Sequence, residues 1–317
     1  MYSGHVRPIP DLSPLSGLRF LVVGLARNCE KTVRADIERI KSALGASLSL
    51  HWLLIESDSS DKTVLELRKA RDEVENFQFK TLGSLQLRFP KRTDRIAVCR
   101  NSYVNEIRSN KSFESIDYVV VADFDGLNSH ITRGAIESCW TRGGWDICAA
   151  NQRGPYYDIW ALRHPEWSPN DCWQHYGFLL KFNGNPECSL RAAVHSRMIT
   201  IPEKSGWIEV ESAFGGFAVY RKNLFEYSEY SGVNDQGEES CEHVYFHRQL
   251  AARKIRFFIN PDLINAEYTE HSRGLLLLNT LYRRFRVFLR RIISSTLGGE
   301  FVGYIKRLTS LGAQKKR

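Results

Sequence analysis

The sequence has no long hydrophobic run. None of its apolar stretches approaches the roughly 18 to 20 residues that a membrane-spanning helix needs. The longest early stretch, LRFLVVGLA at 18–26, follows a proline-rich start and lacks the basic region and small-residue cleavage site of a signal peptide. We therefore expect no spanning helix and no export signal. A composition of 43% hydrophobic and 25% charged residues indicates a folded protein rather than a disordered one.

Closely spaced cysteines are also missing. The seven cysteines are odd in number and scattered, and no two have the spacing of a metal-binding pair. They are Cys29, Cys99, Cys139, Cys148, Cys172, Cys188 and Cys241. This usage predicts reduced, buried thiols in a cytoplasmic protein.

Acidic residues are nearly absent from the end of the chain. Residues 273–317 hold eleven Lys or Arg and one acid, Glu300, so this segment has a net charge of +10. The whole chain carries +8, which leaves −2 for the other 272 residues. Any attraction to a membrane or another polyanion must therefore come from 273–317, and we expect no nucleic-acid partner.

The first half alternates between strand and helix patterns. Apolar runs predict strands, and apolar residues at every third or fourth position predict the helices between them. The predicted strands are 19–25, 48–55, 77–82 and 118–122, and the predicted helices are 28–45 (with Asn28 as its cap), 61–74 and 93–109. The less regular second half predicts strands at 207–213, 215–221 and 255–259 and a helix at 241–253. This order predicts an α/β fold with a mixed, mainly parallel sheet flanked by helices, in a domain over 1–272 followed by a tail over 273–317.

Two acids follow the fourth predicted strand, in the segment YVVVADFDGLN. Side chains at alternate positions of a strand point the same way, so Asp123 and Asp125 are expected to face one spot. Two close carboxylates are costly unless a cation neutralises them, and Mg²⁺ or Mn²⁺ shared with a diphosphate would do so. The alternative is a simple strand-end turn at Asp125 and Gly126.

One family with this motif is the haloacid-dehalogenase-like phosphatases, in which DFDG would supply an aspartyl nucleophile and an acid. Those enzymes also need a later lysine and a downstream acidic pair, and no D-D or G-D-x-x-x-D follows residue 126. Their motif usually opens the domain, whereas about a hundred residues of α/β pattern precede it here. We keep this family as an alternative.

The chain more closely resembles nucleotide-sugar-dependent glycosyltransferases of the GT-A fold. The resemblance covers residues 19–126 and is carried by IESDSSDKT at 55–63, RIAVCRN at 95–101 and VVVADFDG at 119–126. It implies that Asp123 and Asp125 bind Mn²⁺ or Mg²⁺ on a UDP- or GDP-sugar. The donor-binding residues that it implies are Arg27, Glu56, Asp58, Arg95, Arg100, Asn101 and Asp123.

The second half resembles this family more loosely. Aromatic segments at 143–167 and 211–221 are similar to the acceptor side of bacterial surface-polysaccharide transferases and of fungal capsule-associated mannosyltransferases. The candidate catalytic acids are Asp158 and Glu242. Glu242 is followed by His243 where inverting relatives have a second acid, and a metal on His243 and His247 is less expected than a surface location for both. His271 stands where many such enzymes place a third metal ligand.

The tail predicts a basic amphipathic helix. Residues 275–297 place apolar side chains on one helical face with arginines mostly opposite, which is typical of a helix lying on a membrane surface. The alternative is a helix packed on the domain. We therefore expect a cytoplasmic, peripheral glycosyltransferase acting on a glycan or lipid-linked acceptor in surface polysaccharide synthesis; a non-enzymatic basic adaptor for membranes or nucleic acid is the remaining alternative.

Overall fold

Apolar runs of the sequence form the strands of one mixed sheet. The computed structural model describes residues 13–269, which lie in one compact unit of the chain. The predicted boundary at 272 and the predicted tail lie outside the described residues.

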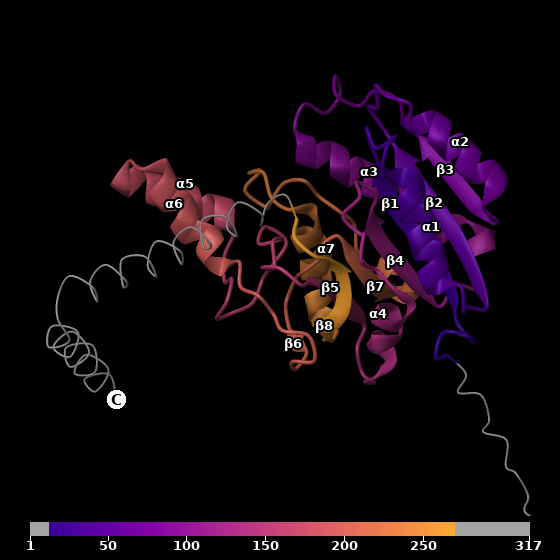
Figure 1. Ribbon diagram of the computed structural model, residues 1–317. Helices are drawn as coiled ribbons and strands as arrows, with labels where there is room; N and C mark the ends of the chain where they lie inside the picture. The colour runs from indigo at the N-terminus through magenta and orange to yellow at the C-terminus, as the bar shows by residue number, and fades with distance from the viewer. Residues whose placement is uncertain (1–12, 270–317) are drawn as a thin grey trace, which may run out of the picture. The chain divides into compact units, whose positions relative to one another are not determined.

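Eight strands and seven α-helices make up the described part (Figure 1). In chain order they are β1 (Arg19–Ala26), α1 (Val33–Leu44), β2 (Ser49–Glu56), α2 (Thr63–Glu73), β3 (Phe77–Thr81), α3 (Arg92–Ser109), β4 (Tyr118–Asp123), α4 (Arg133–Glu137), β5 (Ile147–Gln152), α5 (Cys172–Asn183), α6 (Pro186–Ala193), β6 (Ile208–Glu209), β7 (Phe217–Arg221), α7 (Glu242–Leu250) and β8 (Phe257–Ala266). Short 3₁₀ helices occupy Lys111–Phe113, Ser138–Trp140, His195–Arg197, Lys222–Glu226 and Ala251–Arg253.

The strand order is β3-β2-β1-β4-β7-β5-β8-β6. The neighbours among β1 to β4 are parallel, as are β5 and β8, while β7 and β6 run antiparallel to their neighbours. This confirms the predicted fold class of a mixed, mainly parallel sheet flanked by helices. The register places Ala26 opposite Glu56 and Leu25 opposite Asp123, so the carboxyl ends of β1, β2 and β4 meet at one edge.

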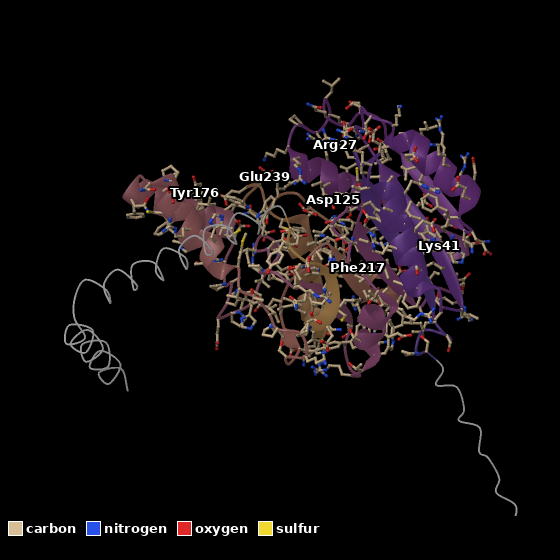
Figure 2. All side chains as sticks on the ribbon, in the orientation of Figure 1. Arg27, Lys41, Asp125, Tyr176, Phe217 and Glu239 are labelled. Atoms are coloured by element: carbon tan, nitrogen blue, oxygen red, sulfur yellow. The ribbon has the colours of Figure 1, made fainter. Side chains whose placement is uncertain are left out.

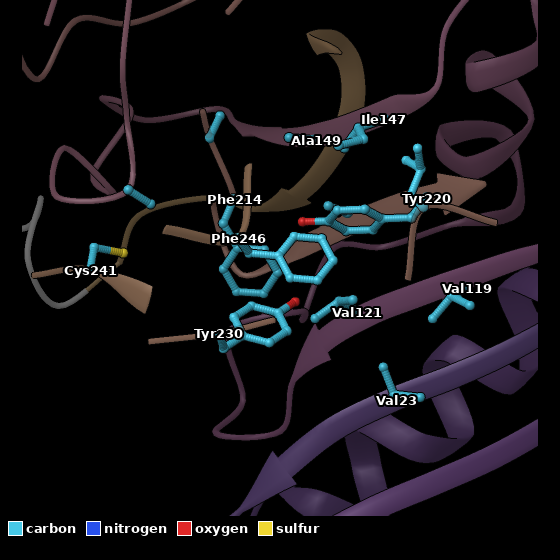
Figure 3. Packing of buried hydrophobic residues seen from close by; sticks show 14 of the residues in the cluster. Val23, Val119, Val121, Ile147, Ala149, Phe214, Tyr220, Tyr230, Cys241 and Phe246 are labelled. Carbon is cyan, nitrogen blue, oxygen red and sulfur yellow. The ribbon is translucent and has the colours of Figure 1, made fainter. Parts of the chain in front are cut away.

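Each face of the sheet is covered by its own core. Alternate side chains of β1 divide between them: Val22 packs in the cluster that includes α1 and α2, and Val23 packs in the cluster that includes α3 and α7. Strands covered on both faces read as continuous apolar runs, which is why the parallel strands were visible in the sequence. On the α7 side the core is aromatic, with Tyr220, Tyr230 and Phe246 packed together (Figure 3).

Some predicted boundaries were wrong. Helix α1 begins at Val33, and Asn28 lies before it in the left-handed region, with φ of 49°. The Asn28 side chain accepts a hydrogen bond from the Ser60 N–H, so it ties two loops together and does not cap the helix. The strand predicted at 207–213 is reduced to the two residues of β6, and the predictions missed β5 and α4 to α6.

Within residues 13–269, no helix is long and apolar enough to cross a membrane.

Candidate active site

Two carboxylates end the strand at the middle of the sheet. Asp123 is the last residue of β4, and Asp125 follows Phe124. The Phe124 ring is buried against Gly24 of β1, where a Cβ atom would lie 2.4 Å from a ring carbon. Because the ring takes the inward position, the Asp123 side chain stays 32% exposed and Asp125 is exposed. Both acids therefore reach solvent at the carboxyl edge of the sheet.

Helix α1 holds the loop that carries these acids. The Thr32 hydroxyl donates to the Phe124 carbonyl at 3.0 Å, and the Gly126 N–H donates to the Asp36 carboxylate at 2.8 Å. Burial raises the pKa of Asp36 to about 6; the Gly126 N–H opposes this shift, and the charge of Asp125 adds to it. Sequence reasoning missed Asp36, although an acid on the apolar face of a helix was the available signal.

Carboxylates outnumber cations around Asp123. Burial raises the pKa of Asp123 to about 8, and the charges of Asp125, Asp158 and Glu242 act in the same direction. Arg100 opposes them, with its Nη2 atom 3.8 Å from the Asp123 Oδ1 atom. Like charges this close are stable only when a proton or another cation joins them. The raised pKa therefore marks a place that is short of positive charge.

Arg100, which was predicted to bind phosphate oxygens, is a buried residue of α3 beside the carboxylates. It is 4% exposed, and its Nε atom donates to the Glu242 Oε1 atom at 3.0 Å. Its Nη1 atom donates to the Tyr103 hydroxyl at 3.2 Å, and its guanidinium carbon lies 5.3 Å from the Phe214 ring centre and 5.5 Å from that of Tyr230. Arg100 therefore holds Glu242 in place and partly balances Asp123.

Asp158 lies near the same charges from a different segment. Its Oδ2 atom accepts from the Gly215 N–H at 3.0 Å, and its Oδ1 atom accepts from the Ala161 N–H at 3.3 Å. Burial raises the pKa of Asp158, the two N–H groups lower it, and the charge of Glu242 raises it further. The structure thus brings together four predicted acids, from β4, the loop after it, the loop after β5 and the start of α7.

Two glycines connect this cluster to β7. Gly215 and Gly216 have φ of 71° and 85°, a region that favours glycine. The Gly216 carbonyl accepts from the Asp123 N–H at 3.0 Å, and a Cβ atom on Gly216 would lie 2.1 Å from the Leu127 Cδ2 atom. Close backbone approach therefore fixes the position of Asp123.

Arg27 and Asp58 lie at the ends of β1 and β2. Arg27 is exposed, and its side chain makes no hydrogen bond or ion pair within the described residues; it lies over the same end of the strands as Asp125 (Figure 2). The Asp58 carboxylate accepts from the Leu85 and Gln86 N–H groups at 2.8 and 3.0 Å. Burial raises the pKa of Asp58, but these N–H groups outweigh burial and lower it overall, with help from Arg27. Asp58 therefore shapes the loop after β3 at this edge.

Glu56 ends β2 and is 3% exposed. Its carboxylate accepts from the Ser59 N–H at 3.0 Å and from the Thr81 hydroxyl. It thus orders the polar loop at 57–62, next to Arg27.

Arg95 and Asn101, both predicted to bind the donor, have partners within the protein. Arg95 donates to the Phe89 and Pro90 carbonyls at 2.8 and 2.7 Å, and its Nε atom lies 3.9 Å from the Asp58 Oδ2 atom. The Asn101 side chain bonds the backbone N–H and carbonyl of Tyr230, both at 2.8 Å. These contacts hold loops against α3, so the structure gives both residues a positioning role.

His243 and His247 are buried, so their predicted surface location was wrong. The Tyr220 hydroxyl lies 2.9 Å from the His247 Nε2 atom, and the His247 Nδ1 atom lies 2.8 Å from the Ser212 hydroxyl, which donates to the Ala161 carbonyl. This chain of bonds fits a neutral imidazole with its proton on Nδ1. Burial, and then the charge of Arg100, lower the pKa of His247 to about 3. Burial likewise lowers the pKa of His243.

A cavity of about 720 Å³ lies between α7 and the segments 163–165 and 209–212. Its walls include Glu209, Val244, His247 and Phe257, and none of the predicted catalytic or donor-binding residues lines it.

No group of three or more His, Cys, Asp and Glu side chains within residues 13–269 is arranged to hold a metal. His271, the predicted third ligand, lies outside the described residues and remains a prediction.

No protein-family model matches the sequence, and no curated protein matches it. Among solved structures, the chain is similar to a mannosyltransferase from Pyrobaculum calidifontis in complex with GDP-Man and Mn²⁺, with 13% identity and a TM-score of 0.45 over 80% of this chain and 58% of the other. It is similar to residues 1–349 of TarS from S. aureus, with 13% identity and a TM-score of 0.46 over 79% and 60% of the two chains.

A third similar structure is glucosyl-3-phosphoglycerate synthase from Mycobacterium tuberculosis in complex with UDP, with 16% identity and a TM-score of 0.41 over 82% of this chain and 74% of the other. The chain thus spans about three fifths of the length of the first two chains that it matches. Likeness at this level concerns the fold alone, and the function proposed next depends on this chain's own residues.

Proposed function

We propose that the protein is a metal-dependent glycosyltransferase that moves a sugar from a nucleotide donor to a glycan or lipid-linked acceptor. One observation carries the proposal: Asp123 and Asp125 stand at the solvent side of the carboxyl edge, and the cation beside Asp123, Arg100, is already paired with Glu242. In sheets of this kind ligands bind beyond the carboxyl ends of the strands.

A divalent cation fits these residues. The donors are carboxylate oxygens, which Mg²⁺ and Mn²⁺ accept, and the nearest cation, Arg100, is already paired with Glu242. Asp123 and Asp125 would hold the ion, with diphosphate oxygens completing its ligands. When bound, it supplies positive charge to the departing diphosphate. His271 is proposed as a further ligand.

The donor would lie along the ends of β1 and β2. Arg27 is exposed there with its side chain unpaired within the described residues, and a guanidinium suits phosphate oxygens. The loops ordered by Glu56 and Asp58 would border the nucleoside. The backbone at Gly215 and Gly216 would allow the sugar to approach closely.

Asp158 is our candidate to take a proton from the acceptor, because its side chain is partly exposed whereas Glu242 is 6% exposed. Burial raises the pKa of Asp158, and the Glu242 Oε1 atom accepts from Arg100. In the transfer, the acceptor oxygen forms a bond to the anomeric carbon and its proton passes to the Asp158 carboxylate. The bond from that carbon to the diphosphate oxygen breaks, and its electron pair leaves with the nucleoside diphosphate. Glu242, oriented by Arg100, would bind an acceptor hydroxyl.

A phosphatase of the haloacid-dehalogenase type is the weaker candidate. Its motif would need a lysine beside the aspartates, and the ion-pair partner of Asp123 within residues 13–269 is Arg100.

A cytoplasmic, peripheral location and a role in surface polysaccharide synthesis remain parts of the proposal, as does a membrane role for the tail.

The test is a panel of UDP- and GDP-sugars with Mn²⁺ or Mg²⁺, scored for release of the nucleoside diphosphate. We expect release with one donor class that stops in excess chelator. Release of inorganic phosphate from phosphate monoesters, with none from the panel, would favour the phosphatase instead.

A further inference from the structure

Helix α5 exposes a concentration of large apolar side chains. Trp173, Phe178 and Phe182 are 46%, 56% and 77% exposed, and Cys172 is the one fully buried residue of the helix. The other exposed large apolar side chains of the described residues are scattered; they are Leu48, Leu65, Leu87, Ile199 and Tyr227. Helices α5 and α6 pack together and project from one side of the sheet (Figure 1). A soluble protein rarely leaves such a cluster uncovered without a partner.

The exposed side of α5 is distinct from the side that packs on the protein. Tyr176 and Leu179 lie against the core, on the face turned toward it. Lys181 lies on the opposite face. Measured around the helix axis at about 100° per residue, Trp173 is about 80° to one side of Lys181 and Phe178 is about 60° to the other. The Phe178 and Phe182 rings lie 4.8 Å apart and form one apolar ridge. This face is therefore a lysine flanked by aromatic rings.

The charge of α5 complements an anionic surface. The helix contains no Asp or Glu, and the Lys181 amine has no partner within the described residues. Residues 1–272 carry a net charge of −2, so this part of the chain as a whole is not attracted to an anionic surface. Aromatic side chains beside lysine are typical of segments at a membrane interface, because the rings enter the acyl boundary while the amine reaches the headgroups.

We propose that α5 docks this protein on the surface of a phospholipid bilayer that contains anionic lipid. A protein partner is less favoured because specific protein interfaces carry about ten hydrogen bonds, and the exposed face of α5 offers few polar groups. Lys181 is one of them, and the other, Gln174, already donates to Glu238 at 3.0 Å. A lipid surface requires apolar area and positive charge, which α5 has.

The base of α5 is bonded to segments on the acceptor side of the candidate site. Asp171 caps the helix by accepting from the Trp173 and Gln174 N–H groups, and it also accepts from Trp160 and Arg163 in the segment that follows Asp158. Gln174 contacts the loop that leads to Glu242. If the proposed function holds, docking of α5 would place the acceptor side of the site toward the bilayer, and the acceptor would be lipid-linked.

The experiment measures binding of the full chain to vesicles of phosphatidylcholine and phosphatidylglycerol, by co-sedimentation at low and high salt. The test variant is Phe178→Ser with Phe182→Ser, and the control is Leu48→Ser with Leu65→Ser, two side chains that are 56% and 47% exposed elsewhere. High salt screens attraction by the basic residues 273–317 and leaves the apolar contribution of α5. We expect the test variant to bind about tenfold or more weakly at high salt, and the control to bind like the parent.

Equal binding of parent and test variant at both salt concentrations would overturn the proposal. The proposal would also be overturned if the parent did not bind vesicles but formed a dimer that the test variant does not form. In that case α5 would bind a second copy of the chain. Both variants should release nucleoside diphosphate from a soluble assay like the parent. Vesicle binding without turnover of any nucleotide sugar would refute the proposed function and leave the docking surface standing.

Discussion

The Arg100 Nε atom donates to the Glu242 Oε1 atom at 3.0 Å, across 142 residues of sequence. The two side chains are 5% and 8% exposed. A buried pair of this kind is costly to break, because removing one partner leaves an uncompensated charge. It therefore fixes α7 against α3 and sets the position of an acid at the candidate site.

Arg100→Met should destabilise the protein by about 3–5 kcal/mol, because Glu242 loses its buried partner. The measurement is urea unfolding followed by circular dichroism. Adding Glu242→Gln to this variant should restore part of the loss. The control is Arg191→Met, whose partner Glu187 is exposed, with an expected cost of about 0–1 kcal/mol. Equal costs for Arg100→Met and Arg191→Met would refute the importance of the buried pair.

Gly216→Ala should lower both stability and activity. The added Cβ atom would lie 2.1 Å from the Leu127 Cδ2 atom, in a backbone conformation with φ of 85°. Strain of this type costs about 1–3 kcal/mol, measurable as a lower thermal midpoint. Gly206→Ala is the control, because a Cβ atom added at Gly206 would have no neighbouring atom within 4 Å. Identical midpoints for the two variants would contradict the close packing at Gly216.

Stability should fall as pH drops below the ordinary pKa of histidine. Burial lowers the pKa of His247 to about 3, so between that pH and about 6.5 the unfolded chain binds a proton that the folded chain does not. Each such group contributes a slope of about 1.4 kcal/mol per pH unit, with stability rising as pH rises. His247→Asn should reduce the slope of unfolding free energy against pH.

Ser212→Ala is the matched control for that experiment. It removes a hydrogen bond to His247 but keeps the imidazole, so stability should decrease at every pH while the slope remains. A slope that His247→Asn leaves unchanged would show that His247 is not the group responsible.

Asp158→Asn should reduce kcat by about 10²–10⁴-fold, because the variant loses the proton acceptor for the acceptor hydroxyl. The dissociation constant of the nucleoside diphosphate, measured by calorimetry, should stay near that of the parent. If the affinity for the nucleoside diphosphate fell by the same factor as kcat, Asp158 would instead have a structural role through its bond to the Gly215 N–H.

The parallel half of the fold could be predicted because its strands and helices carry simple periodic patterns. YVVVA is apolar on both faces of β4 and is buried on both, and α1 carries its apolar residues at helical spacing. The second half could not be predicted in the same way. Helix α5 carries apolar residues on its exposed face as well as on the face packed against the core, so its sequence lacks the one-sided pattern of an amphipathic helix.

The positions of candidate site residues could be predicted where those residues follow a strand. They could not be predicted where they depend on contacts between distant parts of the sequence. The edge location of Glu56, Asp123 and Asp125 follows from strand ends alone. Arg100 is buried because it pairs with Glu242. Asp36 contributes to the site by accepting a hydrogen bond from the Gly126 N–H. Those pairings join residues far apart in the sequence, which periodicity does not reveal.

The most direct test is the affinity for Mn²⁺, measured by electron paramagnetic resonance in the presence of UDP or GDP. We expect the parent to bind Mn²⁺ with the nucleotide and Asp125→Asn to bind it at least about tenfold more weakly. Asp72→Asn, which changes an exposed acid of α2, should bind like the parent. Equal Mn²⁺ binding by the parent and Asp125→Asn would contradict the account.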